Sequence, residues 1–564
     1  MGILWTGNPF VDAGIAAILA ATETLKPEEV KDEELRKAAE RLEQILLSDQ
    51  SLGINVEDSF ARKELSQVFP NSELVNPSNW KGGPEAVRKK FRNALKADLE
   101  RALLCLKNNG SSTCLLCGRK APTEGTVAVR KDKVPMLSGM VNFYSAFTAG
   151  VTICGVCAFA IRFLPMSITR TGGTGRLWFL HIQSPEIASE ISKTYCWAKF
   201  ELAKSSNSPL KFYNEWQTAG DAGTVLYVLC ELLSRAGYQL RNVCLNPMPT
   251  TAYIFSNDLR KPFVTAYSIP NKLLKFLAGL QIKGNHFFDR FRRELLRVPK
   301  NLDDKDKKGR EAFVRDVSLR MLNREKIIAL CLDHGNEAEG KTPSLRGGWV
   351  AQGLYLLEVL EMLESKLSII ENLGIKIARD DDSRKYIMQL RKSENLYGLF
   401  LDFVKKGLIT HDQFYTLLPP NDDLRASEIR DMVLGVIYEW QNCRDRGLEF
   451  PEVTKNEVIL VEDQIIKRIR QIGERLLGSL PSPERWIARL QTARSPAQIR
   501  GVYLRAVRDG AIGFNDFVFL VPLEDRGMLW LLRDYLLAFL FEKTAGNGSL
   551  PEEVISFEDR EELF

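Results

Sequence analysis

Two cysteine pairs constrain the fold of this chain more than any other feature of its sequence. Cys114 and Cys117 form one C-x-x-C pair, Cys154 and Cys157 form a second, and 36 residues separate the two pairs. Each C-x-x-C turn presents two thiolates to one ion, and two such turns complete the closed tetrahedral site that Zn²⁺ prefers. The spacing therefore predicts a structural zinc site within residues 111–180, a loop-rich region too small to build its own core.

Two other interpretations of the cysteine pairs stay open at this stage. The four thiols could be core cysteines that are close by coincidence, or the pairs could be redox-active. Gly118 follows the first pair and Gly155 lies within the second, which favours the tight turns that thiolate ligation requires. A catalytic metal is disfavoured because a four-cysteine site leaves no open position and because no histidine lies near these cysteines in the sequence.

The chain of 564 residues is too long for one core. Residues 1–110 carry helical patterns, 251–257 and 263–269 read as strands, and the charged stretch 301–310 is a candidate boundary. After residue 345 the pattern is almost purely helical, with short polar loops. We therefore predict an α+β chain, with a mixed α/β region over 1–345 that includes a four-cysteine zinc-binding module at 111–180, followed by an all-α helical bundle over 346–564.

Positive charge is segregated along the chain although the formal net charge is only +5. One basic set surrounds the cysteine pairs: Arg119, Lys120, Arg130, Lys131, Lys133 and Arg162. It continues into the stretch TRTGGTGR, where Arg170 and Arg176 flank glycines that could approach a phosphate, or that could form a solvated loop.

A second basic set lies in the predicted bundle. Residues 467–508 hold ten Lys or Arg and two acidic residues, whereas the segment from Ser549 onward is acidic. Arg485 and Arg489 are spaced to share one helix face, and Arg505 and Arg508 nearly do so. Arg500 is a further candidate phosphate contact. Arginine suits phosphate contacts, so this set indicates nucleic acid or an acidic protein partner, although a charge run is often only a solvated face.

The first ten residues, MGILWTGNPF, allow two interpretations. Gly2 and Thr6 fit the loose pattern for N-myristoylation, which would make the protein a membrane-associated scaffold. Gly7, Asn8 and Pro9 form a tight turn before a helix, where the backbone could approach a ligand. No leader peptide and no membrane-length apolar run are visible, and the scattered cysteines favour a reducing, cytoplasmic location without a membrane.

Enzymatic motifs are weak in this sequence. Asp380, Asp381 and Asp382 form a run in a predicted loop, where capping is the simpler interpretation and metal binding the alternative. No nucleophile motif, HExxH sequence or nucleotide fingerprint is found. The rival to a binding protein is a zinc-stabilised nucleic-acid-processing enzyme of a nuclease-like kind.

The sequence resembles one family, the large subunit of type I-B CRISPR Cascade complexes, in its CxxC–CxxC branch. The segment WTGNPFVD at residues 5–12 and the two cysteine pairs carry this resemblance, with the chain length and the helical C-terminal part. The resemblance implies a non-catalytic subunit that contacts guide RNA, target double-stranded DNA, other Cascade subunits and a helicase–nuclease effector.

On this resemblance the subunit touches the duplex next to the protospacer and aids R-loop formation, while the guide reads the target sequence. Asn8 becomes a candidate for reading base edges, because its amide can both donate and accept in a groove. Asp12 becomes a candidate cap of the following helix. The alternative is that the segment only packs against neighbouring protein, with Trp5 and Phe10 as anchors.

Overall fold

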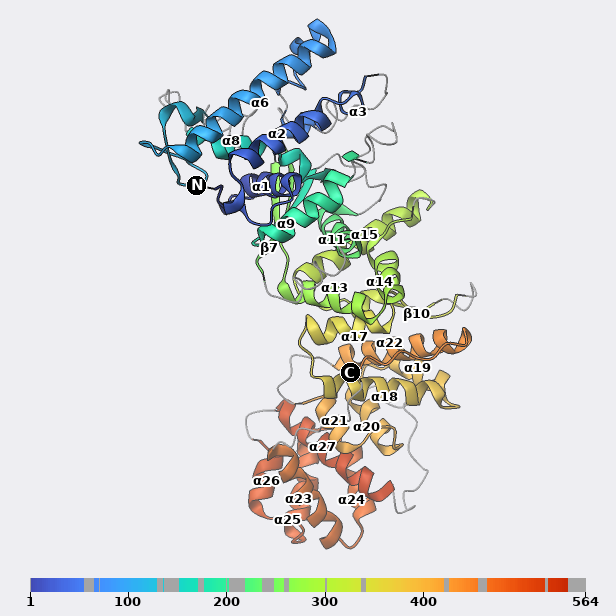
Figure 1. Ribbon diagram of the computed structural model, residues 1–564. Helices are drawn as coiled ribbons and strands as arrows, with labels where there is room; N and C mark the ends of the chain where they lie inside the picture. The colour runs from blue at the N-terminus through green and yellow to red at the C-terminus, as the bar shows by residue number, and fades with distance from the viewer. Residues whose placement is uncertain are drawn as a thin grey trace. The chain divides into compact units, whose positions relative to one another are not determined.

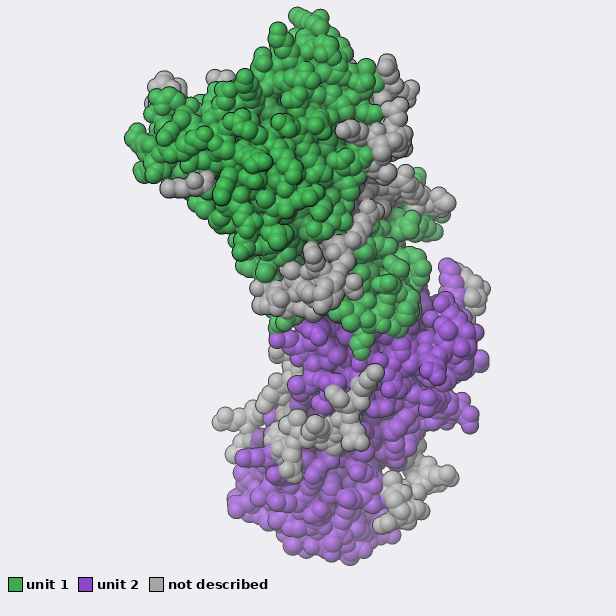
Figure 2. All heavy atoms as spheres, in the orientation of Figure 1, with its two compact units in different colours: residues 1–327 green, residues 328–564 purple. Residues whose placement is uncertain are grey.

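The computed structural model describes most of the chain in two compact units, which span residues 1–327 and 328–564 (Figure 2). The described residues are 2–54, 65–69, 72–128, 135, 152–170, 177–198, 200–201, 219–235, 248–257, 263–299, 302–335, 341–419, 426–454, 464–522 and 526–545. The chain is mostly helical with small antiparallel sheets, which agrees with the predicted α+β class.

The boundary between the units differs from the predicted position at residue 345. Strand β9 (Leu332–Asp333) pairs with β10 (Ser344–Leu345), and β10 packs against helix α22 (Ala426–Asp445). This hairpin therefore belongs with the helices that follow it. The stretch 301–310 is also not a boundary loop, because Asp303 caps helix α15 (Asp304–Leu322) by accepting from the Asp306 amide.

The first unit is built around helix α1 (Pro9–Thr22), whose residues from Val11 to Thr22 are all buried. A helix that is apolar on every side needs neighbours on every side. It packs against α2 (Asp32–Leu46), α8 (Gly155–Arg162) and α9 (Pro185–Ile191) (Figure 1).

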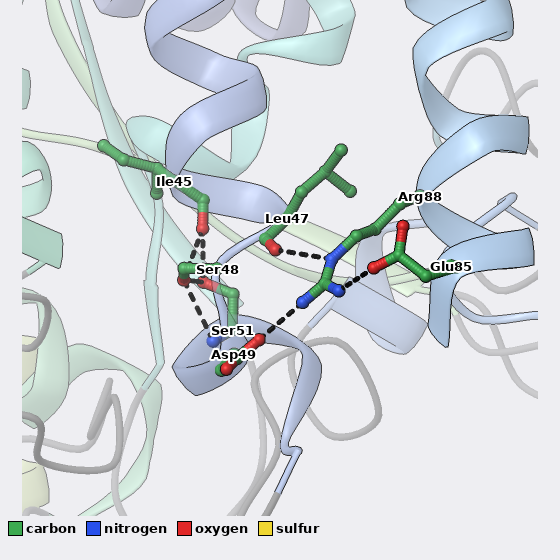
Figure 3. A network of polar contacts seen from close by, with 7 residues as sticks. All are labelled: Ile45, Leu47, Ser48, Asp49, Ser51, Glu85 and Arg88. Carbon is green, nitrogen blue, oxygen red and sulfur yellow. Dashed lines mark hydrogen bonds and ion pairs between the residues drawn. The ribbon is translucent and has the colours of Figure 1, made fainter. Parts of the chain in front are cut away.

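Helix α6 (Gly83–Lys107) packs along α8 (Figure 1). Several of its basic residues form ion pairs within the unit. Arg88 on α6 donates to the Leu47 carbonyl and pairs with Asp49 and Glu85, which fixes α6 to the chain that follows α2 (Figure 3). The bond to Glu85 is the largest cause that raises the pKa of Arg88. This charge is therefore neutralised within the unit.

The main sheet of this unit is antiparallel, with the strand order β5–β6–β7–β8. The predicted strands at 251–257 and 263–269 are confirmed as β7 (Thr250–Ser256) and β8 (Phe263–Ser268). Strand β6 (Leu177–Ile182) pairs with β7 over its whole length and contacts α1. Further described elements of the unit include α3 (Asp49–Leu52), α5 (Leu65–Val68), β5 (Thr169–Arg170), α11 (Gly220–Arg235), α13 (Asn271–Lys283) and α14 (Asn285–Phe291).

The second unit is helical apart from its one described hairpin. Its described helices are α16 (Ile328–Cys331), α17 (Trp349–Glu358), α18 (Glu364–Arg379), α19 (Ser383–Lys392), α20 (Leu396–Lys405), α21 (His411–Leu417), α22, α23 (Gln464–Ser479), α24 (Pro483–Thr492), α25 (Pro496–Arg508), α26 (Phe514–Leu520) and α27 (Arg526–Ala545). Helix α18 packs on α22, and α27 packs against α20, α21 and α23 to α26.

A buried carboxylate holds three parts of the second unit together. Glu371 on α18 accepts from the Trp349 indole at 2.6 Å and from the Val453 and Thr454 amides at 2.8 and 3.2 Å. The Thr454 hydroxyl donates to the same carboxylate. Because every one of these donors is buried, the carboxylate satisfies groups that would otherwise cost free energy to bury.

Candidate metal centre

The first cysteine pair lies in the turn between two short strands, β1 (Ser112–Thr113) and β2 (Lys120–Ala121). The Cys114 amide donates to the Arg119 carbonyl at 2.9 Å, and the Gly118 amide donates to the Cys114 carbonyl at 3.0 Å. Gly118 has a φ of 69°, in the left-handed region that favours glycine. The expected turn role of Gly118 is therefore confirmed.

The second pair lies where strand β4 (Thr152–Cys154) runs into helix α8. Strand β4 pairs with β3 (Thr126–Ala128), and the Leu115 amide donates to the Thr152 carbonyl at 3.2 Å, which joins the two halves of the site. Cys154 precedes the helix and Cys157 is in its first turn.

Gly155 does not act as a turn residue, in contrast to the expectation. It is the first residue of α8, and a Cβ at this position would lie 2.5 Å from the Arg101 carbonyl carbon of α6. The glycine is needed because the two helix backbones approach closely there, so that α8 can bring Cys154 and Cys157 to the first pair.

The four cysteine sulfurs form one cluster, with all four within 4.8 Å of one another. The Sγ atoms of Cys114 and Cys157 are 3.8 Å apart, and those of Cys117 and Cys154 are 3.7 Å apart. A tetrahedron of sulfurs at a Zn–S bond length of about 2.3 Å has edges of about 3.8 Å. The geometry therefore fits one tetrahedral ion held by four thiolates, and Zn²⁺ is such an ion.

The electrostatics of the cluster favour at least one thiolate. Cys114, Cys154 and Cys157 are buried, and Cys117 is half-buried. The hydrogen bond from Cys117 is the largest cause that lowers the pKa of Cys114, whereas the bond to Cys114 is the largest cause that raises the pKa of Cys157. Four crowded thiols cannot all ionise without a counter-charge, and a bound cation supplies that charge.

Helix α8 is also anchored to the rest of the unit by a buried ion network. Arg162 donates to both Glu73 carboxylate oxygens, at 2.7 and 3.1 Å, and to Asp98 on α6 at 2.7 Å. Only 8% of Arg162 and 1% of Asp98 are exposed. The expectation that Arg162 belongs to a basic surface is wrong, because tertiary folding places two carboxylates around it.

The other basic residues predicted around the cysteines have different positions. Arg119 donates to the backbone carbonyls of Cys105 and Gly2, at 3.4 and 3.2 Å, so it ties the N-terminal segment to the cysteine turn. Lys120 is exposed and donates to the Thr113 hydroxyl at 2.6 Å. The remaining members of this basic set lie outside the described residues: Arg130, Lys131, Lys133, Arg176 and the side chain of Arg170.

The N-terminal segment forms a tight turn that is fixed by a buried carboxylate. Asn8 caps α1, since its Oδ1 accepts from the Phe10 and Val11 amides, both at 3.2 Å. Asp12 is fully buried and accepts from the Thr6 amide at 2.8 Å, the Thr6 hydroxyl at 2.7 Å and the Gly7 amide at 2.9 Å. The cap role expected for Asp12 thus belongs to Asn8, and Asp12 instead holds the turn.

A histidine that the sequence did not single out completes this arrangement. His181 on β6 has its Nε2 3.0 Å from an Asp12 carboxylate oxygen, and its ring is stacked on Trp5, with centroids 6.3 Å apart. These residues border a small cleft between α1, β6 and α9. Because 168 residues separate Asp12 from His181 along the chain, no local pattern could have paired them.

Gly2 and Phe10 also have structural roles in the segment. A Cβ on Gly2 would lie 2.1 Å from the Glu28 carbonyl oxygen, so the backbone there leaves room only for glycine. The Phe10 ring contacts those of Phe179 and Phe255 on the sheet. These contacts account for Gly2 and Phe10 by packing within the unit.

In the second unit the predicted basic set divides into paired and unpaired arginines. Arg468 and Arg475 pair with Asp516, Arg470 pairs with Asp412, and Arg508 lies 3.6 Å from Asp509. Arg485, Arg489, Arg494 and Arg505 are exposed, and within the described residues none of them forms an ion pair. Arg500 is half-buried, and its Nε is buried without a hydrogen-bond partner in the described part of the chain.

The aspartate run at 380–382 lies in the loop between α18 and α19 and stabilises its turn. The Asp382 amide donates to the Asp380 carboxylate at 2.8 Å, and Asp381 is exposed. These contacts are those of a loop turn between two helices.

Comparisons with known proteins found no match to this chain. No family model matches the chain, and neither the curated proteins nor the solved structures contain a match. Among the described helices, none is long and apolar enough to cross a membrane.

Proposed function

We propose that this protein is a non-catalytic, nucleic-acid-binding subunit of an RNA-guided DNA surveillance complex, similar to the large subunit of type I-B Cascade. The observation that carries the proposal is the set of exposed arginines on and between α24 and α25 that have no ion-pair partner among the described residues: Arg485, Arg489, Arg494 and Arg505. Unpaired arginines at this density provide the charge-assisted, bidentate donors that phosphate groups bind.

In this proposal the cysteine cluster holds Zn²⁺ with a structural role. Four thiolates fill the coordination shell, so the ion has no position for a substrate or water. The ion would fix α8, whose backbone at Ala160 lies against Gly14 of α1, where a Cβ would be 1.9 Å from the Ala160 oxygen. The zinc site thereby supports the helix that carries the N-terminal turn.

The capping bonds of Asn8 limit which of its atoms could contact a base in the proposed role. Its Oδ1 is used by the amides of α1, so only the Nδ2 amide remains to contact a base edge. Such a donor suits an acceptor in the groove of the protospacer-adjacent duplex, such as a purine N7, and does not give a bidentate contact to adenine. Guide RNA, other complex subunits and a helicase–nuclease effector are the partners that this assignment implies.

A salt titration of DNA binding tests the arginine surface. The protein, in its complex with guide RNA, is compared with the double variant Arg485→Gln/Arg489→Gln. If both arginines contact phosphates, the slope of log affinity against log salt falls by about two. The matched control is Arg315→Gln/Arg444→Gln, which removes two exposed arginines that Asp316 and Asp445 already neutralise, and leaves the slope unchanged.

Two results overturn the proposal. The first is a full-length protein that neither co-purifies with guide RNA from its native host nor binds DNA at low salt. The second is metal-dependent cleavage of DNA or RNA by the purified protein that is lost in Asp380→Asn/Asp382→Asn, which would assign the chain to the nuclease-like class.

A further inference from the structure

Helices α25 and α26 present large apolar side chains to solvent, and α25 also carries exposed arginines. Phe514 is 70% exposed, Leu504 is 53% exposed and Val518 is 49% exposed. Leu504 and Arg508 are four residues apart on α25, with Arg505 beside them, and Phe514 and Val518 are four apart on α26. The two helices pack against each other. We refer to these five residues as the α25–α26 patch.

The patch combines exposed apolar side chains with positive charge, and both features are typical of a binding surface. Exposed aromatic and aliphatic side chains that gather on adjacent helices are typical of binding surfaces. The Phe514 ring also stacks on Phe517, with centroids 6.3 Å apart, which presents a flat aromatic surface. Arg505 has no ion pair within the described residues and Arg508 has only the 3.6 Å contact to Asp509, so the occupant should be acidic as well as apolar.

The chain itself contains a segment of this composition. Residues 546–564 lie outside the described part of the structure. Their sequence from 549 onward is SLPEEVISFEDREELF, which has six acidic residues and one arginine, with Ile555, Phe557, Leu563 and Phe564 between them. Acidic and aromatic side chains in alternation match the arginines and apolar side chains of the patch.

The segment is long enough to reach the patch. Helix α27, which joins α26 to this segment, has 20 residues and packs against both α25 and α26. Its length is about 30 Å. The twelve residues from 546 to 557 span up to about 40 Å when extended, so Phe557 can return along α27 to the start of that helix.

We propose that residues 549–564 dock in cis on the α25–α26 patch, with Phe557 against Phe514 and the acidic residues beside Arg505 and Arg508. A tethered segment reaches an effective concentration in the millimolar range, so weak individual contacts suffice. The docking and the proposed function share one residue, because Arg505 is also among the arginines assigned above to nucleic acid, whereas Arg485 and Arg489 lie outside the patch.

Photo-cross-linking in the full-length protein tests the docking without nucleic acid present. A photoreactive benzoylphenylalanine replaces Phe557, and cross-linked peptides are mapped by mass spectrometry. We expect cross-links to residues 501–518 with a yield that does not depend on protein concentration. The double variant Arg505→Glu/Arg508→Glu lowers the yield roughly fivefold, as expected for two exposed charge pairs, and Phe514→Ser lowers it too.

Matched controls separate docking from general surface effects. Leu448→Ser removes a side chain that is 60% exposed elsewhere in the same unit, and Arg444→Glu changes an arginine outside the patch. Both variants keep the cross-link yield of the wild type. All these side chains are exposed, so the variants fold.

Three outcomes overturn the proposal: cross-links to other regions, cross-links between chains that increase with concentration, or patch cross-links that the patch variants do not reduce. If the segment gives no cross-link while a DNA probe cross-links to α26, the patch is a nucleic-acid site instead. Each of these results leaves the salt test of Arg485 and Arg489 unaffected.

Discussion

Replacing one cysteine ligand by serine tests the metal site directly. The Cys114 sulfur lies 3.8 Å from that of Cys157, so Cys114→Ser removes one corner of a tetrahedron that the fold has already assembled. A serine hydroxyl is a neutral and poor ligand for Zn²⁺, and the affinity should fall by orders of magnitude. At free zinc about 1,000 times the Kd, the bound ion stabilises the folded state by about 4 kcal/mol, and the variant loses this stabilisation.

The effect should appear in the unfolding of the first unit. This unit spans 327 residues. For domains of a few hundred residues, 1 kcal/mol corresponds to about 2 °C in Tm, so we expect Cys114→Ser to lower the Tm by about 8 °C. Calorimetry at fixed free zinc, with metal content measured on the same samples, checks both numbers. Chelation of the wild-type protein should reproduce the shift.

Cys105→Ser is the matched control for this experiment. Cys105 is equally buried in the same unit, and its Sγ donates to the Gly125 carbonyl at 3.1 Å, a bond that a serine hydroxyl can replace. This variant should keep one zinc per chain and its response to chelation. The reasoning is refuted if Cys114→Ser retains stoichiometric zinc, or if chelation leaves the Tm of the wild type unchanged.

Three further predictions concern carboxylates, of which Asp12 and Glu371 are buried and Asp412 is half-buried. Asp12→Ala leaves the donors of the N-terminal turn unsatisfied and should lower the free energy of unfolding by about 3 kcal/mol in denaturant titrations. Asn8→Ala removes only the helix cap and should lower it by about 1 kcal/mol. Equal effects of the two variants would contradict the conclusion that Asp12 holds the turn. Glu371→Ala should lower the free energy of unfolding by about 4 kcal/mol, because several buried donors lose their acceptor, and Glu371→Gln should lower it less, because the amide oxygen still accepts. The His411 hydrogen bond, followed by Arg470, lowers the pKa of Asp412 to about 2 from its usual 3.8. Because the pKa of Asp412 is lower in the folded state, its ionised carboxylate stabilises the fold above pH 3.8, and this stabilisation is lost as the pH falls toward 2. Asp412→Asn should therefore flatten the acid side of the stability profile measured by urea unfolding. The control variant Asp381→Asn should leave that profile unchanged.

The cysteine cluster could be predicted from the sequence because its signal is local. A C-x-x-C turn fixes two ligands within four residues, and only the meeting of the two turns requires the fold. The strands at 251–257 and 263–269 were predictable for the same reason, since Pro and Asn turns bound each apolar run. The almost purely helical pattern after residue 345 conceals a break, because the chain leaves the helix between α17 and α18, where Glu361 has a φ of 57°.

The N-terminal turn shows what local patterns cannot provide. Asp12 does not cap α1, because it lies within the first turn of that helix and Asn8 provides the cap. Its partner His181 comes from strand β6, far along the chain. A sequence can show that a polar residue interrupts an apolar helix. It cannot show which distant residue compensates the burial of that charge, because this depends on how β6 packs against α1.

The arginines of residues 467–508 show why a local charge count overstates a binding surface. The sequence count of ten basic and two acidic residues assumes that neutralising acids lie nearby in the chain. In the folded unit, Asp516 alone pairs with two of these arginines, and Asp412, from another helix, pairs with a third. These arginines lie on α23, which packs on α27, whereas the unpaired ones lie on and between α24 and α25. Ion pairing within the fold therefore confines the charge available to a partner to two successive helices, and phosphate binding should depend on those positions and not on Arg468, Arg470 or Arg475.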